Sequence, residues 1–113
     1  MFRFKGFTEK ANVALNLAVE SAQQMGHTYI GSEHLLLALV RESSGVAAHY
    51  LKERGVTEER LREAVASATG VGTPTAVSAA DMTPRTKNII EASSDECDKI
   101  TFGNLSVFKK YLN

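Results

Sequence analysis

Residues 26–40, GHTYIGSEHLLLALV, decide how the rest of the chain folds. A Gly-His pair opens the stretch. Ser32 then offers a side-chain oxygen that can cap a helix, and Glu33 lies in the first turn, where a negative charge suits the helix dipole. Every residue from 35 to 40 is apolar. We therefore expect a helix from Glu33 to about residue 42 that is buried nearly all round and that the other segments cover.

Three further helices are expected around this central one, over 8–25, 46–55 and 57–70. Their apolar residues recur every three or four positions, which is typical of helices with one buried face. Thr8 and Thr57 can cap the first and the last of them, and a glycine follows or ends each segment. Four helices joined by short loops predict a compact all-α unit.

The chain divides into three parts on this reading. Residues 1–69 form one complete four-helix repeat, and residues 70–81, GVGTPTAVSAAD, lack helical period and are interpreted as a linker. Residues 82–113 are interpreted as a truncated and diverged second repeat that packs on the first within a single domain. Shifting the chain by 75 residues places Thr8 on Thr83, which can cap a helix that begins with proline.

Composition argues against several function classes. The 113 residues hold 13 Lys+Arg and 13 Asp+Glu, so a formally neutral chain gives no electrostatic reason to expect nucleic acid or an anionic membrane as partner. A single cysteine excludes an internal disulfide framework and favours the cytoplasm. There is no GxxxxGK[ST] phosphate loop, no signal-peptide pattern and no apolar run long enough to span a bilayer.

The residues that could carry catalysis or bind a metal are few. The three histidines, His27, His34 and His49, lack the short ligand spacing of a zinc site, so we expect no metal and no cofactor. His34 is interpreted as packing at a helix start and donating one ring hydrogen bond. Cys97 could be a nucleophile, but it falls on an apolar stripe and is interpreted as a small buried thiol.

The segments that resemble a known family are FTEKA at 7–11, GH at 26–27, IG at 30–31 and EHLLLAL at 33–39. Together they resemble the Clp N-terminal repeat, which forms the amino-terminal domain of ClpC and ClpA/ClpB type AAA+ unfoldases, with the ClpC type nearest. The resemblance covers residues 4–69 well and residues 82–97 less well. It implies the same all-α helical repeat that the periodicity predicts.

A binding role suits the polar residues better than catalysis does. Helix starts at Thr8 and Ser32 can bind an anion through free N–H groups, and the Glu33 carboxylate can pair with a guanidinium, so the two together suit phosphoarginine. The resemblance implies the same ligand, because ClpC-type domains recognise phosphoarginine and use the glutamate of the EHLL motif, here Glu33, with Thr8 matching the helix-start threonine. The alternative is that Glu33 only favours its own helix dipole.

The amino terminus suggests a second surface. Phe2 and Phe4 indicate that it packs on the body of the protein rather than hanging free. The resemblance implies that this edge belongs to a surface used by adaptor proteins and some peptide antibiotics. Simple packing is the alternative.

The function predicted from these features is a non-enzymatic binding module. It would hold adaptors or phosphoarginine-tagged substrates for an AAA+ unfoldase and the ClpP protease, either as part of the unfoldase or as a free-standing copy. The first alternative is a structural module that self-associates as a homodimer, because an incomplete second repeat leaves apolar faces uncovered. The second alternative, a hydrolase using Cys97, ranks last.

Substitutions in the central helix are expected to separate folding from binding. If that helix is buried nearly all round, Leu36→Ala costs about 2–5 kcal/mol of stability. Glu33→Ala should leave the fold nearly unchanged and weaken only a ligand that carries a guanidinium.

Overall fold

The computed structural model describes residue 4 and residues 6–101, with the side chains of the last helix described up to Asp95. These residues form five α-helices and one short 3-10 helix, and no β-strand is assigned among them. The elements are α1 (Glu9–Gln24), α2 (Ser32–Arg41), α3 (Val46–Glu53), α4 (Glu58–Thr69), η1 (Ala79–Asp81) and α5 (Pro84–Thr101). The all-α fold expected from the sequence is confirmed, with helix ends within one or two residues of those expected.

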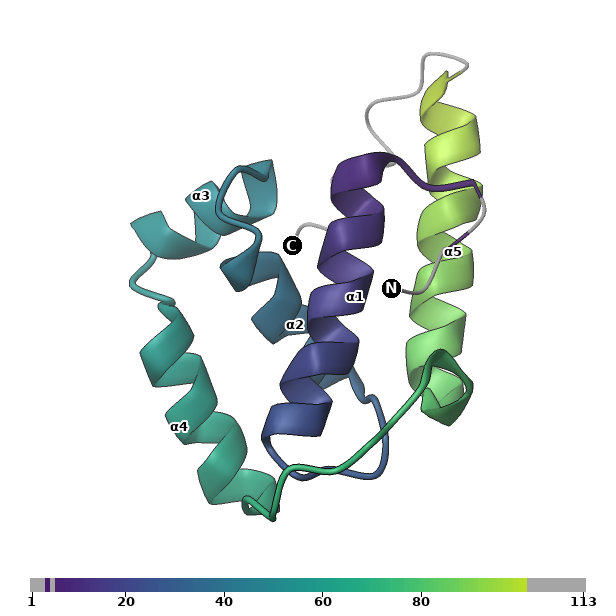
Figure 1. Ribbon diagram of the computed structural model, residues 1–113. Helices are drawn as coiled ribbons and strands as arrows, with labels where there is room; N and C mark the ends of the chain where they lie inside the picture. Colours follow the sequence, from purple (N-terminus) through teal and green to yellow (C-terminus); the bar gives the residue numbers. More distant parts are fainter. Residues whose placement is uncertain (1–3, 5, 102–113) are drawn as a thin grey trace.

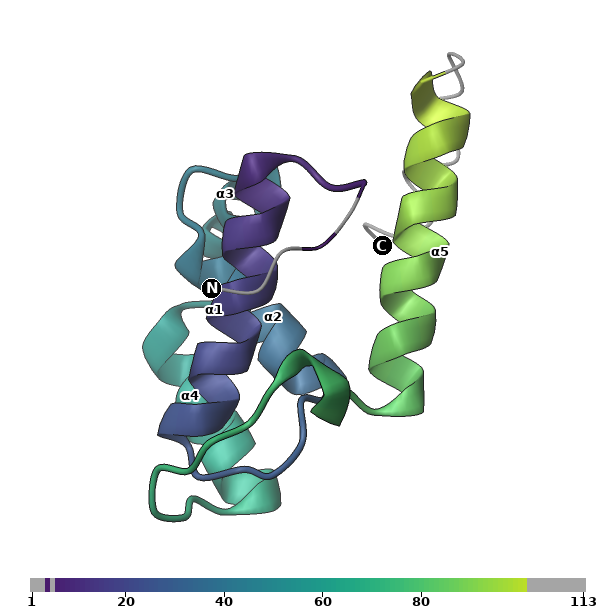
Figure 2. The same cartoon turned by 45° about the vertical axis from the view of Figure 1, so that its right-hand side comes forward.

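The helices are arranged around α1 and α2 (Figure 1). α2 begins at the end of the fold where α1 stops, and it leads back to α3 at the other end. α4 lies on one side of this pair and α5 on the other, and the 45° turn of Figure 2 shows α5 standing apart from α1 along most of its length. α2 contacts all the other α-helices.

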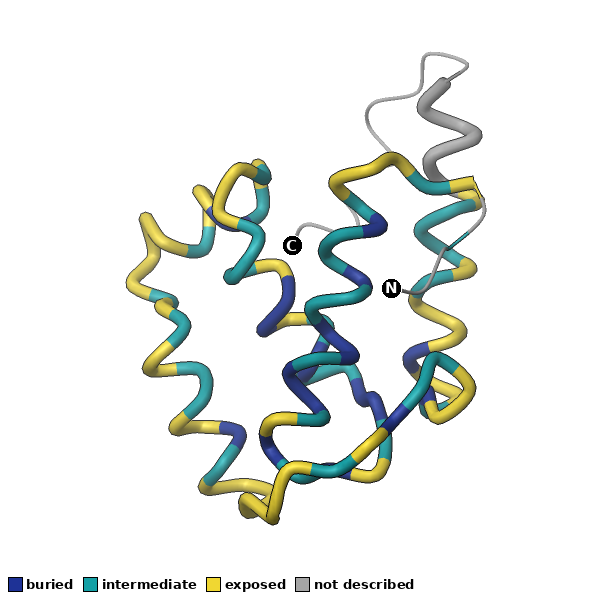
Figure 3. Tube along the Cα trace, viewed as in Figure 1, coloured by how far each residue is buried: buried dark blue, intermediate teal, exposed yellow. Residues whose placement is uncertain are grey.

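Two clusters of buried side chains form the core, and Figure 3 shows stretches of buried residues along α1 and α2 and in the loops beside them. The larger cluster joins α1, α2 and the chain before α5, and consists of Ala18, Val19, Ala22, Ile30, Ala38, Val77 and Met82. The smaller cluster joins the end of α1 to α2 and α4, through Met25, Leu37 and Val65. α2 thus contributes to both clusters, as a central element should.

α2 is not buried all round, however, and that expectation is wrong. Leu37 is fully buried, whereas Leu36 is 36% exposed and Leu39 is 42% exposed. The apolar run made the helix look buried on every side. Within the described residues, its neighbours cover the side of Leu37 and Ala38 and leave the Leu36–Leu39 side open.

Residues 70–78, interpreted from the sequence as linker, lie across the end of α1. The N–H of Gly72 donates to the carbonyl of Met25 at 2.9 Å, and the side-chain amide of Gln23 donates to the carbonyl of Val77 at 2.8 Å. Gly72 also approaches Gly26 so closely that a Cβ on Gly26 would lie 2.3 Å from the Gly72 carbonyl carbon. Gly26 has φ +71°, so both the backbone conformation and the close approach require glycine there.

A single pair of hydrogen bonds brings the starts of α2 and α5 together. Ile30 and Met82 form an isolated parallel β-bridge, in which the N–H of Ile30 donates to Asp81 and the N–H of Thr83 donates to Ile30, both at 3.0 Å. α2 and α5 begin within two residues of this bridge. Two helix N-termini, each with the partial positive charge of its free N–H groups, therefore lie side by side.

Candidate functional site at the start of α2

Thr8 caps α1, as its position in the sequence predicted. Its Oγ1 accepts a hydrogen bond from the N–H of Ala11 at 3.1 Å. α1 has 16 residues and is therefore about 24 Å long, and it begins at the end of the fold opposite to the start of α2 (Figure 1). The structure thus does not bring Thr8 and Glu33 together.

Glu33 lies in the first turn of α2, with its side chain 31% exposed. One carboxylate oxygen lies 3.6 Å from Nδ1 of His34 and folds back over the backbone of Gly31. The carboxylate is thus held against the helix start yet reached by solvent. The Glu33 carboxylate can therefore accept hydrogen bonds from a guanidinium at the surface, and neither charge has to be fully buried.

The bridge between Ile30 and Met82 brings the start of α5, rather than that of α1, next to the start of α2, where Glu33 lies. Thr83 caps α5 as Thr8 caps α1, since its Oγ1 accepts the N–H of Thr86 at 3.1 Å. Sequence analysis found Thr83 as a cap but did not connect it with Glu33. The two residues are 50 positions apart, and no pattern in the sequence indicates a two-residue bridge.

Two buried histidines hold the start of α2 from the inside. The N–H of Gly31 donates to Nδ1 of His34 at 2.9 Å, so this nitrogen carries no proton and the ring proton is on Nε2. Nε2 of His34 therefore donates to Nδ1 of His27 at 2.7 Å, and Nε2 of His27 donates to the carbonyl of Gly70 at 2.8 Å. This His27–His34 chain links the start of α2 to the end of α4.

All hydrogen bonds of the His27–His34 chain can form only when both rings are neutral. A ring that takes up a second proton has an N–H at both nitrogens, so one of these N–H groups would face another N–H donor. Burial, together with the neighbouring His27, lowers the pKa of His34 from 6.5 to about 4. Tyr29 stacks on the His27 ring, with ring centroids 5.5 Å apart. His34 packs at a helix start and donates one ring bond, as interpreted from the sequence, and it also accepts one.

No group of three or more histidine, cysteine, aspartate or glutamate side chains in the described part of the chain is placed to hold a metal ion. His49 lies away from the other two histidines, on α3, where its Nε2 is 3.0 Å from a carboxylate oxygen of Glu53. Cys97 lies outside the described side chains, so its interpretation as a buried thiol stays a prediction.

Phe4 is partly buried and packs against the larger core cluster. Its backbone is fixed by the buried Asn12, whose Oδ1 accepts the N–H of Phe4 at 2.6 Å and whose amide donates to the Phe4 carbonyl at 3.3 Å. Phe2 lies outside the described residues. The packing of the amino terminus on the body is therefore seen at Phe4, while the role of either phenylalanine in partner binding stays a prediction.

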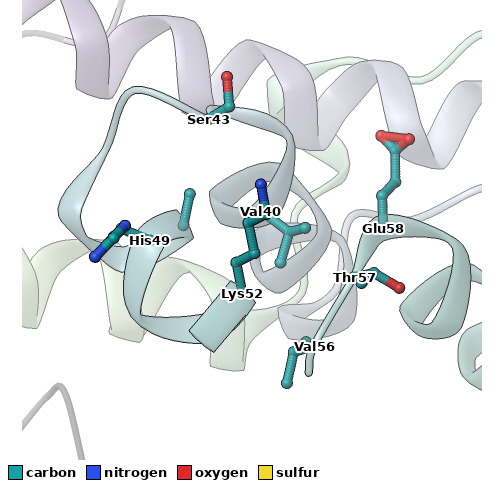
Figure 4. Close-up of a pocket in the computed structure, with 8 residues that line it drawn as sticks. Val40, Ser43, His49, Lys52, Val56, Thr57 and Glu58 are labelled. Atoms are coloured by element: carbon teal, nitrogen blue, oxygen red, sulfur yellow. The ribbon is translucent and has the colours of Figure 1, made fainter. Parts of the chain in front are cut away.

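A concave feature lies where α2, α3 and α4 meet (Figure 4). It is an open hollow of about 330 Å³, lined by Val40, Ser43, Ala48, His49, Lys52, Val56, Thr57 and Glu58. Arg41 braces the α4 side, since its guanidinium is 3.2 Å from both Glu20 and Glu58. Sequence analysis did not find this hollow, because its lining comes from three helices with ordinary composition.

The fold and the site define a small all-α domain in which two helix starts and one half-exposed carboxylate form the candidate site. A sequence model of the family described as the Clp repeat (R) N-terminal domain matches residues 6–107. The chain belongs to this family. In the proteins that carry it, the domain is a non-catalytic amino-terminal part of AAA+ chaperones.

Similar proteins include chaperones and a regulator. Over 97 residues the chain is 42% identical to the chaperone protein ClpB of Oceanobacillus iheyensis, covering 86% of this chain and 12% of that protein. It is 43% identical over the same length to the negative regulator of genetic competence ClpC/MecB of Bacillus subtilis, again covering 86% of this chain and 12% of that protein. It is 36% identical to the chloroplastic chaperone protein ClpC of Pisum sativum, covering 86% of this chain and 10% of that protein. The chain spans only about a tenth of the length of these relatives. No helix among the described residues is both long and apolar enough to cross a membrane.

Proposed function

We propose that this domain is a non-enzymatic binding module that recognises adaptors or phosphoarginine-tagged substrates for a Clp unfoldase and its protease. The observation that carries the proposal is the Glu33 carboxylate, which is partly exposed beside two helix starts. A module of this kind needs no cofactor and acts by docking. Its place of action is the cytoplasm, the compartment that the single cysteine favours.

The chemistry of the two helix starts matches the two ends of phosphoarginine. A guanidinium pairs with a carboxylate through parallel charge-assisted hydrogen bonds, which Glu33 can accept. A phosphate binds at helix starts, where free backbone N–H groups and the helix dipole attract an anion, and the starts of α2 and α5 lie side by side. Thr83 extends the site proposed from the sequence, while Thr8, at the far end of α1, is left as a separate anion-binding candidate.

Glu33→Gln is expected to weaken phosphoarginine binding by about tenfold or more, because the amide keeps the size of the side chain and removes the charge that pairs with the guanidinium. The measurement is a titration of the ¹⁵N-labelled protein with phosphoarginine, followed by amide chemical shifts. Shifts should cluster around Gly31, Glu33 and Thr83 in the unchanged protein.

The matched control is Glu63→Gln, which makes the same change on the exposed side of α4. It should bind like the unchanged protein. Absence of shifts at millimolar phosphoarginine in the unchanged protein would reject the ligand, and an equal loss in both variants would reject the role of Glu33. Shifts confined to the start of α1 would assign the site to Thr8 instead.

Self-association remains the second candidate function because α2 presents an apolar face. Leu36 and Leu39, one turn apart, are 36% and 42% exposed, and Ile89 on α5 is 43% exposed. Apolar side chains grouped on one helix face are a common feature of contact surfaces. A second copy of the domain could cover them.

Leu39→Glu is expected to weaken such self-association by more than about tenfold, because it places a charge in the centre of the contact. Sedimentation velocity at several protein concentrations measures the effect. Val46→Glu is the control, since Val46 is 78% exposed at the start of α3 and tolerates an acidic residue. A monomer at every concentration of the unchanged protein would remove this second function.

A further inference from the structure

The cap of α2 differs from the caps of α1 and α4. α1 and α4 each begin after a threonine whose hydroxyl accepts an N–H of the first turn, whereas α2 begins after Gly31, which has no side chain to do so. The backbone of Gly31 has φ −99° and ψ 177°, a conformation that any residue adopts. Backbone freedom therefore does not explain glycine at this position.

The space that a side chain would fill does explain it. A Cβ built on Gly31 would lie 1.6 Å from Oε1 of Glu33 and 2.8 Å from its carboxyl carbon. The carboxylate of Glu33 thus occupies the volume left by the missing side chain. Any residue other than glycine at position 31 would push this carboxylate away.

Two side chains lie next to Gly31 besides that of Glu33. Nδ1 of His34 accepts the N–H of Gly31, so the cap is made from inside the fold. The ring of Tyr29 lies on the same side, with Cε2 3.1 Å from the position of the added Cβ. Tyr29 therefore borders the volume above Gly31, and the flexible end of the Glu33 side chain, which lies closest to the added Cβ, is the part that yields.

We propose that Gly31 is a positioning residue for Glu33: its missing side chain holds open the volume in which the carboxylate lies, and so fixes where the site accepts a guanidinium. As far as it concerns a ligand, this inference rests on the function proposed above. Gly31 touches no ligand in this scheme and acts only through Glu33. Since the displaced group is the end of a flexible side chain, the fold should tolerate Gly31→Ala.

The experiment compares Gly31→Ala with Gly45→Ala. Gly45 is also a glycine at a helix N-cap, before α3, with an ordinary backbone conformation, and its added Cβ would meet only the Glu42 carbonyl oxygen at 3.4 Å. The two variants make the same chemical change at the same kind of position, but only one lies under a carboxylate. Thermal unfolding of both establishes that each folds.

The first readout needs no ligand. In the unchanged protein, and in Gly45→Ala, a nuclear Overhauser contact is expected between the side-chain protons of Glu33 and the Hα protons of Gly31. Gly31→Ala should remove the close approach and shift the Glu33 side-chain signals. If the unchanged protein lacks this contact, the positioning role is wrong, whether or not phosphoarginine binds.

The second readout is the affinity for phosphoarginine. Gly31→Ala is expected to bind about tenfold more weakly, and Gly45→Ala like the unchanged protein. In a Glu33→Gln background, Gly31→Ala should cause no further loss, because Gly31 acts through the carboxylate that is already gone. Unchanged affinity in Gly31→Ala, or an equal loss in both backgrounds, would overturn the inference. If the Overhauser contact appears but the unchanged protein does not bind phosphoarginine, the proposed function fails and the placement of Glu33 by Gly31 stands.

Discussion

Replacing Leu37 by alanine is expected to lower the free energy of unfolding by about 2–5 kcal/mol. Leu37 is fully buried and lies in the smaller core cluster with Met25 and Val65, where α1, α2 and α4 meet. Removing its branched end leaves a cavity between three helices, none of which can move in without leaving its other contacts. Urea unfolding, monitored by circular dichroism at 222 nm, measures the change.

Leu36→Ala is the matched control, because it makes the same change one position earlier in the same helix. Leu36 is 36% exposed, so we expect a loss below about 1 kcal/mol, partly offset by the higher helix propensity of alanine. This smaller loss of stability replaces the loss of about 2–5 kcal/mol that the sequence led us to expect for Leu36→Ala. Equal losses at the two positions would mean that α2 is buried on every side after all.

The contrast between the two leucines marks how far periodicity can predict this fold. Spacings of three and four, threonine caps and glycine stops located all five helices, because these signals act within a few residues. They could not orient α2, since a run of six apolar residues has no polar side to mark solvent. The exposed side of α2 depends on which helices arrive next to it, and that information is spread over the whole chain.

The candidate site shows the same limit. The sequence identified Glu33 as an acid at a helix start, and it identified Thr8 and Thr83 as caps, all of which are local features. It did not tell which cap lies beside Glu33. The bridge between Ile30 and Met82 decides this, and its two hydrogen bonds are made by backbone groups that nearly every residue carries. The link between His27 and His34 was missed for a similar reason, because a loop separates them.

Acidification is expected to destabilise the domain by about 3 kcal/mol through His34 alone, most of it between pH 6.5 and pH 4. In the folded state the pKa of His34 is lowered to about 4, whereas in the unfolded chain it is near 6.5. Between these values the unfolded chain binds a proton that the folded protein does not, so stability falls as the pH falls. Above pH 6.5 both states are neutral and the stability from this group is fully present. Urea midpoints measured from pH 7.5 to pH 4.5 test this slope.

His34→Gln is the informative variant, because glutamine at the third position of a helix can accept the N–H of the cap residue and donate through its amide without titrating. It should flatten the dependence on pH between 6.5 and 5, at a lower but constant stability. His49→Gln is the control, since His49 is exposed on α3 and lies outside the His27–His34 chain, and it should keep the slope of the unchanged protein.

The pH dependence of stability can be assigned to His34 only when the other titratable groups that contact its ring are taken into account. Glu33, 3.6 Å from Nδ1 of His34, is the acid that faces the ring, and Tyr29 and His27 are its other titratable neighbours among the described residues. Hydrogen bonds from Ser44 lower the pKa of Glu42 below its ordinary value, away from the range in which His34 titrates. A slope that survives in His34→Gln would mean that His34 is not the source of the acid sensitivity. If the stability of the unchanged protein did not fall with pH in this range, the His27–His34 chain would accept a proton without breaking. Its hydrogen bonds would then not require both rings to be neutral.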